Sequence, residues 1–498
     1  MGGNHLLELV TRLNGKVMIS SDVTEADIEG ADIESLIAKI TDKYAGSTGT
    51  VLGGKELRQI AGGAGLVKEP VQVEIIKAAG FRAEAKESES MFTMREVQPE
   101  HTTPGVGDFV AHFQDRFHKL KSIIRSYGNG AGMLNSIDSV KQYAAGRDLG
   151  IVGIVYDKAT TGKGNLLVTL EDESGIVKVL FTQQTRGAEG NIFESASRIA
   201  KDDVIAVRGK VWNNMIIANR LQWPDVPVHQ PKRSEDDVAI AFLSDIHIGH
   251  KLFLERQFTK FLEWLNGHVD SRKELAGKIK YLVLAGDVAE GIGVYPEQQR
   301  ELAIDDIDKQ YGVLFDFLES VPDYIEIFAL PGNHDAVQRA EPQPRLSNEL
   351  AKRLSNVHLV SNPSYLTLHG VKVLAYHGAS LDSIIRNVPG CTYGNPAEPM
   401  KEILKRRHLS PIYGGNVFVP AAVDSLVIDE VPDILHMGHL HKNAYDNYHG
   451  TIVINSGTWQ DRTGFQVKQG HIPSPAILPV YETASMRTSM VDFNSIGE

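Results

Sequence analysis

The chain has 498 residues, which is too long for one ordinary domain, so its length predicts two or three domains. Its hydrophobic fraction of 42% and charged fraction of 23% are typical of globular domains with hydrated surfaces. The formal net charge of −12 excludes a uniformly basic nucleic-acid-binding protein, but it leaves room for local basic patches and bound divalent ions. The single cysteine, Cys391, excludes an internal disulfide framework and a cysteine-rich metal site.

No membrane or targeting segment is predicted. No run approaches the roughly 18 apolar residues that a membrane span requires. The first residues, Met-Gly-Gly-Asn-His-Leu-Leu, lack the basic and then apolar pattern of a signal peptide. We therefore expect a cytoplasmic protein with no membrane partner.

The N-terminal part is predicted to contain two poorly marked regions. Residues 1–60 are expected to form a small helical module, because residues 32–40 place apolar side chains at helical spacing after an acidic start. Residues 61–146 are expected to be a linker with one helix at 109–124, since residues 98–105 are rich in turn-forming residues.

Residues 147–224 change character and predict a small β domain. Its five short apolar runs begin at Ile151, Asn165, Ile176, Val204 and Met215, and a hairpin turn is expected at 171–175. Five strands with one long connection favour an OB-like barrel, with another small barrel or a sandwich as the alternative. Three prolines within residues 224–233 indicate a domain boundary.

Residues 236–498 alternate between strand and helix patterns. The near-continuous apolar runs span residues 238–243, 281–285, 325–330, 371–376, 434–437 and 452–455, and helical patterns span 253–265 and 300–318. Such runs are typical of strands that are buried on both faces. The whole chain is therefore predicted to be a multi-domain α/β protein. Its last domain should be a layered α/β domain that binds ligands beyond the carboxyl ends of its strands.

Five polar motifs follow five of these runs. They are Ser-Asp245-Ile-His247, Gly286-Asp287, Gly332-Asn333-His334-Asp335, Tyr376-His377-Gly378 and Gly438-His439-Leu440-His441. Together they offer carboxylates, an amide oxygen and imidazoles, and a carboxylate such as Asp287 can bridge two cations. Any one motif alone is more often structural than catalytic. All five in order, each after a strand, favour a two-metal phosphoesterase.

This order of motifs resembles the calcineurin-type metallophosphoesterase superfamily over residues 236–490. The resemblance implies that one metal is held by Asp245, His247, Asp287 and His441, and a second by Asp287, Asn333, His377 and His439. It also implies a catalytic role for His334, which would neutralise or protonate the leaving 3′-oxygen. Glu290 stands where protein phosphatases of the superfamily carry the aspartate that orients this histidine.

The identity of the two divalent metal ions follows from the same donors and the same resemblance. Sites that mix imidazoles with carboxylates suit Mn²⁺, Fe²⁺ or Zn²⁺ better than Mg²⁺, which prefers oxygen ligands and water. The resemblance implies Mn²⁺. Arg339 and Arg345, on the loop after the Asn-His-Asp motif, are predicted to contact DNA phosphates, with a solvated loop as the alternative.

The wider layout resembles the small-subunit family of archaeal D-family DNA polymerases. The stretches 242–249, 330–335, 436–441 and 453–460 carry the resemblance, which covers residues 110–498 well. It implies a heterodimeric replicative polymerase whose large catalytic subunit is the partner. The small subunit would carry 3′–5′ exonuclease (proofreading) activity on DNA 3′ ends, and the OB-like domain would dock the large subunit.

Two alternatives to this function are kept. A stand-alone nuclease of the double-strand-break-repair type has similar motifs, but its phosphoesterase domain begins the chain, whereas roughly 235 residues precede the motifs here. A non-catalytic scaffold subunit is the second alternative. Related accessory subunits of eukaryotic replicative polymerases have lost most of these ligands, and here none is missing.

Overall fold

The computed structural model describes residues 17–19, 36–40, 50–52, 81–97, 105–127, 134–184, 186–187, 190–352 and 354–496. The chain forms two units, residues 1–74 and 75–498. In the first unit, β1 (Val17–Ile19) pairs in parallel with β2 (Thr50–Leu52), and residues 36–40 are helical. The predicted helical module thus contains a strand pair as well as a helix, and most of residues 1–60 lie outside the described residues.

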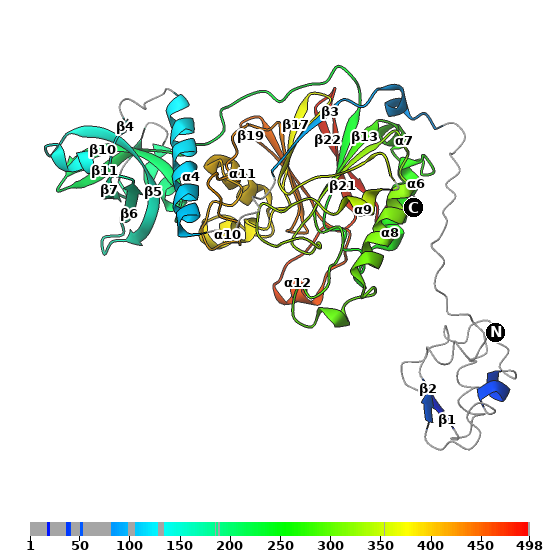
Figure 1. The fold of residues 1–498 in the computed structure, drawn as a ribbon. Helices are drawn as coiled ribbons and strands as arrows, with labels where there is room; N and C mark the ends of the chain where they lie inside the picture. The colour runs from blue at the N-terminus through cyan, green and yellow to red at the C-terminus, as the bar shows by residue number, and fades with distance from the viewer. Residues whose placement is uncertain are drawn as a thin grey trace. The chain divides into compact units, whose positions relative to one another are not determined.

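The α/β class predicted for the chain is confirmed, and the C-terminal domain contains two sheets (Figure 1). The first sheet has the order β15-β14-β13-β12-β21-β22. Its strands are β12 (Ala239–Leu243), β13 (Ile279–Ala285), β14 (Glu326–Leu330), β15 (Val357–Leu359), β21 (Ile477–Glu482) and β22 (Arg487–Asp492). β12 to β15 are mutually parallel, and the near-continuous apolar runs in β12, β13 and β14 are typical of such buried strands.

The second sheet has the order β19-β20-β18-β17-β16-β3. Its strands are β3 (Phe92–Glu96), β16 (Ser364–Leu368), β17 (Val371–Ala375), β18 (Ile434–Met437), β19 (Asn443–Tyr448) and β20 (Thr451–Ser456). β17, β18 and β20 run parallel to one another. All six apolar runs predicted as strands are therefore strands, but they are divided between two sheets.

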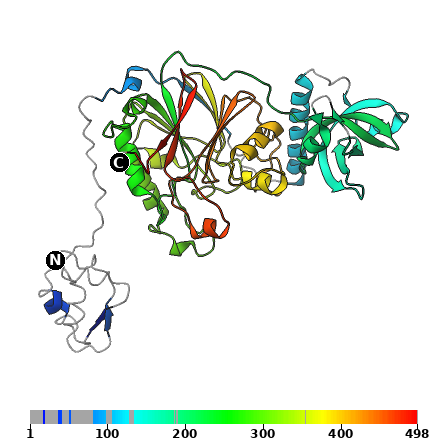
Figure 2. The same cartoon turned by 180° about the vertical axis from the view of Figure 1, so that it is seen from behind.

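Apolar side chains from the two sheets meet in one shared core, to which Phe242, Phe328 and Ile454 belong. α6 (Glu255–Leu265), α7 (Lys273–Gly277) and α8 (Ile307–Glu319) cover the outer face of the first sheet. α10 (Leu381–Asn387) and α11 (Ala397–Arg406) cover the outer face of the second. Seen from behind, the same order of layers is visible (Figure 2). α6 buries Phe258, Phe261, Leu262 and Leu265, the helical spacing that a one-sided apolar stripe requires.

Residues 148–222 form a closed five-stranded barrel. Its strands are β5 (Asp148–Thr160), β6 (Leu166–Asp172), β7 (Gly175–Phe181), β10 (Val204–Trp212) and β11 (Met215–Gln222). The ring closes because β10 pairs with both β11 and β5, while β11 pairs in parallel with β7. A helix, α5 (Ile192–Ser197), lies in the long connection between β7 and β10. The five strands predicted here are confirmed, and ring closure excludes the sandwich alternative.

The linker predicted for residues 61–146 needs correction where the structure describes it. β3 pairs with β16 along five residues and so forms the edge of the second sheet. The expected helix is α4 (Val106–Ser126), and Arg116 on its buried face donates to Asp424 at 2.6 Å. The strand was hidden in the sequence, because a five-residue edge strand with three consecutive exposed residues has no pattern that separates it from a loop.

A buried ion pair joins the barrel to the C-terminal domain. Arg406 at the end of α11 donates from Nε to Asp203 at 2.7 Å, and Glu402 on the same helix accepts from its guanidinium as well. Arg198, which follows α5, reaches Glu402 at 2.7 Å. All three of Asp203, Glu402 and Arg406 are nearly inaccessible to solvent.

No helix among the described residues is long and apolar enough to cross a membrane.

We predict that Asp203→Ala destabilises the chain by about 3–5 kcal/mol, because it leaves the buried Arg406 without its aspartate. The exposed pair of Asp148 and Arg208 provides the matched control, and Asp148→Ala should cost less than about 1 kcal/mol. Denaturant unfolding of the two variants measures both effects. Equal losses of stability would show that the buried pair does not hold the two domains together.

Candidate metal centre

The seven predicted metal ligands lie on loops that directly follow strands of both sheets. Asp245 and His247 follow β12, Asp287 follows β13, Asn333 follows β14, His377 follows β17, and His439 and His441 follow β18. Parallel strands end at one edge of their sheet, and the two sheets are stacked, so these loops converge. The structure brings all seven side chains together at this edge.

The first group of ligand atoms comes from Asp245, His247 and His441, and these atoms lie within 4.8 Å of one another. The Nε2 atoms of the two histidines are 3.1 Å apart, and His441 Nε2 is 3.3 Å from Asp245 Oδ1. Asp245 is completely buried, and its Oδ1 has no hydrogen-bond partner among the described residues. A buried carboxylate oxygen without a donor is costly unless a cation completes its surroundings, so this group fits a metal ion.

The second group comes from Asp287, His377 and His439, also within 4.8 Å. His377 donates from Nδ1 to the carbonyl of Ala285 at 2.8 Å, which leaves Nε2 to face Asp287 Oδ2 at 3.3 Å. The same Nε2 lies 3.0 Å from Asn333 Oδ1. Asp287 Oδ2 is also 4.0 Å from His247 Nε2. Asp287 therefore lies between the two groups, where a bridging carboxylate would stand.

Strained backbone is concentrated at these residues. Five of the seven predicted ligands have positive φ: Asp245 at 51°, His247 at 55°, Asp287 at 49°, His439 at 67° and His441 at 53°. Few residues other than glycine adopt this region, and such conformations cost about 1–3 kcal/mol each where nothing compensates them. The strained residues are those that carry predicted ligands. The loops therefore place these side chains at a cost to the local stability of the backbone.

Two glycines allow the loops to approach each other. A Cβ on Gly332 would lie 2.2 Å from Asp287 Oδ1, and one on Gly286 would lie 2.6 Å from His377 Nδ1. Asp335 then fixes both loops, because its carboxylate accepts from the backbone of Gly332 at 2.8 Å and Ala289 at 3.1 Å. Within its motif, Asp335 therefore holds the two loops together and is not one of the predicted ligands.

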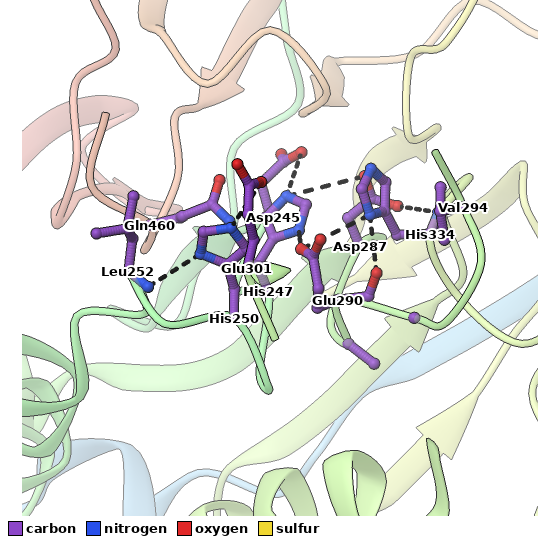
Figure 3. Close-up of polar contacts among 12 residues, drawn as sticks. Asp245, His247, His250, Leu252, Asp287, Glu290, Val294, Glu301, His334 and Gln460 are labelled. Carbon is purple, nitrogen blue, oxygen red and sulfur yellow. Dashed lines mark hydrogen bonds and ion pairs between the residues drawn. The ribbon is translucent and has the colours of Figure 1, made fainter. Parts of the chain in front are cut away.

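Glu290 and His334 lie beside the first group (Figure 3). The Glu290 carboxylate accepts from Nδ1 of His247 at 2.7 Å, and this leaves His247 Nε2 facing His441. His334 donates from Nδ1 to the backbone carbonyl of Glu290 at 2.9 Å and lies 3.7 Å from its carboxylate. Glu290 therefore orients the predicted ligand His247 with its side chain and His334 mainly with its backbone.

The charges of the site shift several pKa values. Burial disfavours charge on every member, yet the carboxylates of Asp287 and Glu290 outweigh burial and raise the pKa of His334. Burial likewise opposes charge on His377, but Asp287 raises the pKa of His377 to about 10. The imidazoles in turn hold the pKa of Asp287 well below its usual range despite its burial. The site is a network of opposite charges in a low-dielectric environment.

Residues outside the seven have separate roles. Arg339 donates to the carbonyl of Val294 at 2.6 Å, and Arg345 lies 4.0 Å from Glu96 on β3. Neither contact shows how a phosphate would bind, so their DNA contacts stay a prediction.

His250 is not one of the seven predicted ligands. Its Nε2 lies 3.5 Å from Glu301 (Figure 3).

Sequence reasoning missed two partners of the predicted ligands. The side-chain amide of Gln466 lies 2.9 Å from Nδ1 of His441, and Asp382 lies 3.4 Å from Nε2 of His439. Gln466 follows its histidine by 25 residues in a segment without any strand or ligand signal. Single glutamines and aspartates outside a motif carry no recognisable pattern, so no signal in one sequence could have found them.

Known proteins resemble this chain over most of its length. Residues 240–445 match the family of the B subunits of DNA polymerases alpha and epsilon. The chain is 42% identical over 385 residues to the DNA polymerase II small subunit of Archaeoglobus fulgidus, which covers 76% of this chain and 75% of that protein. The chain belongs to the family of archaeal DNA polymerase II small subunits. The predicted resemblance to the small subunits of archaeal DNA polymerases is thereby confirmed.

Two further relatives in this family carry the same name. The subunit of Methanothermobacter thermautotrophicus is 38% identical over 394 residues, which cover 78% of this chain and 80% of that protein. The subunit of Methanocaldococcus jannaschii is 39% identical over 391 residues, which cover 77% of this chain. The chain spans 65% of the length of that relative.

We predict that Glu290→Gln weakens binding of Mn²⁺ about 10- to 100-fold, since the carboxylate that orients His247 and raises its basicity is lost. Glu301→Gln is the control, because Glu301 contacts His250 and Tyr295 but no predicted ligand. Electron paramagnetic resonance of free Mn²⁺ during titration measures the affinity. If Glu290→Gln bound Mn²⁺ with unchanged affinity, Glu290 would not be needed to orient His247 for metal binding.

Proposed function

We propose that the chain is the small subunit of a heterodimeric replicative DNA polymerase and carries metal-dependent 3′–5′ exonuclease activity on DNA 3′ ends. The observation that supports this proposal is the complete ligand set, with Asp287 lying between two groups of imidazoles and carboxylates. A polymerase subunit that hydrolysed phosphodiesters at 3′ ends would serve in proofreading.

Two divalent ions would supply an activated water and neutralise the phosphate when bound. The mixed nitrogen and oxygen donors suit Mn²⁺, Fe²⁺ or Zn²⁺, and the resemblance to the superfamily favours Mn²⁺. Asp245, His247, Asp287 and His441 would hold the first, and Asp287, Asn333, His377 and His439 the second. With these ligands the site would be a metallophosphoesterase centre of the calcineurin type, as the order of the motifs predicts.

His334 is proposed to act on the leaving group. Its Nδ1 is held by the carbonyl of Glu290, so its Nε2 is the nitrogen that remains for a substrate. The neighbouring carboxylates raise its pKa, which favours the protonated ring that can neutralise or protonate a leaving 3′-oxygen. The backbone N–H of His334 donates to Asp287 Oδ1 at 2.8 Å, which ties the proposed acid to the proposed bridge.

Both alternatives have an observation against them. A scaffold subunit would not need five strained, converging residues around a carboxylate oxygen without a donor. A stand-alone repair nuclease has no barrel before its catalytic domain, whereas here a buried ion pair joins the barrel to that domain.

We expect Asp287→Ala to abolish hydrolysis, because neither metal keeps its full set of ligands. His334→Ala should lower turnover about 10²–10⁴-fold and leave metal binding intact, since His334 serves the transition state. The assay follows Mn²⁺-dependent release of a 3′-terminal label from single-stranded DNA, together with the metal content of each variant.

The matched controls for this assay are Asp305→Ala and His118→Ala, which remove an exposed carboxylate and an exposed imidazole far from any predicted ligand in the sequence. Both should keep wild-type rates. Near-normal activity in Asp287→Ala would rule out the two-metal site. If metal content fell with turnover in His334→Ala, His334 would be a ligand.

The barrel is proposed to be an OB-type domain that docks the large catalytic subunit. Its strand order and the helix between its third and fourth strands support this interpretation. Its surface carries the exposed side chains of Tyr156, Ile176 and Trp212, and three acidic residues at 171–173, where β6 ends, disfavour DNA. Exposed large apolar groups of this kind suit a protein partner.

We predict that Trp212→Glu or Ile176→Glu reduces co-purification of the large subunit with this chain by at least about tenfold, because a charge would be buried in an apolar contact. Val417→Glu, on an exposed loop of the C-terminal domain, is the control. The measurement is pull-down after co-expression. Loss of the partner in Val417→Glu alone would move the docking surface to the C-terminal domain.

A further inference from the structure

A segment at the edge of the metal centre is not explained by coordination. Residues 461–474, here called the rim segment, follow β20 and contain α12 (Gly464–Lys468), which projects beyond the strands (Figure 1). The backbone N–H of Ser474, at its end, donates to the carbonyl of His441 at 2.8 Å. The Gln466 side chain contacts the imidazole of His441. The rim segment is therefore attached directly to a predicted ligand.

Gln466 also fixes the helix that carries it. Its side-chain oxygen accepts from the backbone N–H of Thr463 at 3.1 Å, and the Thr463 hydroxyl accepts from the backbone N–H of Gln466 at 3.3 Å. This capping box defines α12, which buries none of its residues. Polar contacts to the site, and not an apolar core, hold α12 in place.

The rim segment is also connected to the second group of ligands. The ring of His471 lies 5.9 Å from that of Tyr393, and the Tyr393 hydroxyl donates to Asp382 at 3.1 Å. Asp382 in turn contacts His439. The rim segment therefore adjoins both halves of the predicted dinuclear site.

Large apolar side chains of the rim segment face solvent. Phe465 is 71% exposed, Val467 is 54% exposed and Ile472 is 64% exposed, and Phe465 and Val467 flank Gln466 on α12. Tyr393 beside them is 41% exposed. Keeping these side chains in water costs hydrophobic free energy without any gain to the fold, so a ligand that covers them is expected.

The charge of this region suits a nucleic acid. Arg462 and Lys468 lie on the rim segment and Lys442 directly follows His441, whereas Asp461 is the one carboxylate in the segment. Arg462 Nε is buried without a hydrogen-bond partner among the described residues. The chain as a whole has a net charge of −12, so this local excess of positive charge stands out. It favours a nucleic acid, with its phosphate backbone, over an apolar peptide as the binding partner.

We propose that the rim segment is the base-binding wall of the nuclease site, on which Phe465 stacks against an unpaired base near the DNA 3′ end. This inference rests on the proposed exonuclease function. Phosphate ligation by metals is blind to whether a nucleotide is paired, whereas an exposed ring can stack on a base that has left its duplex. Phe465 would thus give the site its preference for unpaired ends.

The test compares two single strands with the same 3′-terminal label, one with natural nucleotides at its end and one with abasic tetrahydrofuran residues at its last three positions. The full chain with Mn²⁺ should release the label from the natural strand faster. Phe465→Ala should lower kcat/KM on the natural strand about 10-fold, chiefly through KM, and leave the abasic strand unaffected. Phe465→Trp should restore the natural rate.

Tyr413→Ala, which removes an exposed ring from the segment between α11 and β18, is the control and should change neither rate. The unchanged rate on the abasic strand shows that Phe465→Ala is folded and loaded with metal. An unchanged ratio of the two rates in Phe465→Ala overturns the base-binding wall and leaves the nuclease proposal standing. If the wild-type chain degrades neither strand, the nuclease proposal itself is overturned.

Discussion

The structure depends on one constraint, which is that strands of two stacked sheets end at a common edge. β12, β13 and β14 are held in parallel register in one sheet, and β17 and β18 in the other. Because the apolar core between the sheets fixes their separation, the loops at that edge are held within contact of each other. Every close approach in the site, from the paired imidazoles to Asp287 between the two groups, follows from this arrangement. Burial of continuous apolar strands is thus the source of the chemical geometry.

The site opposes the stability of the fold that creates it. Asp245 and Asp287 are buried carboxylates, and positive φ at five predicted ligands adds backbone strain. Opposing imidazoles and backbone donors offset part of this cost. His439, for example, donates its backbone N–H to Asp245 at 2.9 Å. Such strain persists only where the surrounding layers are strongly determined, and here helices cover both outer faces.

The sequence predicted the strands and the gathering of the candidate ligands at one sheet edge, because both leave strong patterns. Runs such as 281–285 are typical of strands buried on both faces, and polar motifs follow five of the six runs in order. The division into two sheets was not predictable, since buried strands have the same sequence in either sheet. β3 was missed because its exposed edge gives it a loop-like pattern. Gln466 and Asp203 were missed because their partners, His441 and Arg406, become neighbours through tertiary packing alone.

The position of β3 in the chain sets the order in which the C-terminal domain can be completed during synthesis. β3 pairs with β16, and the backbone N–H of Val97 donates to the Ser361 hydroxyl, a contact that spans 264 residues. The edge strand therefore leaves the ribosome long before its partner exists, and the entire barrel is made in between. Long-range pairing of this kind slows folding and leaves a strand unpaired for as long as synthesis continues. The strands of the barrel all lie within residues 148–222, so the barrel can close before β16 is synthesised. This topology favours a barrel that folds first. The C-terminal domain then completes its second sheet by pairing β16 with the earlier strand β3.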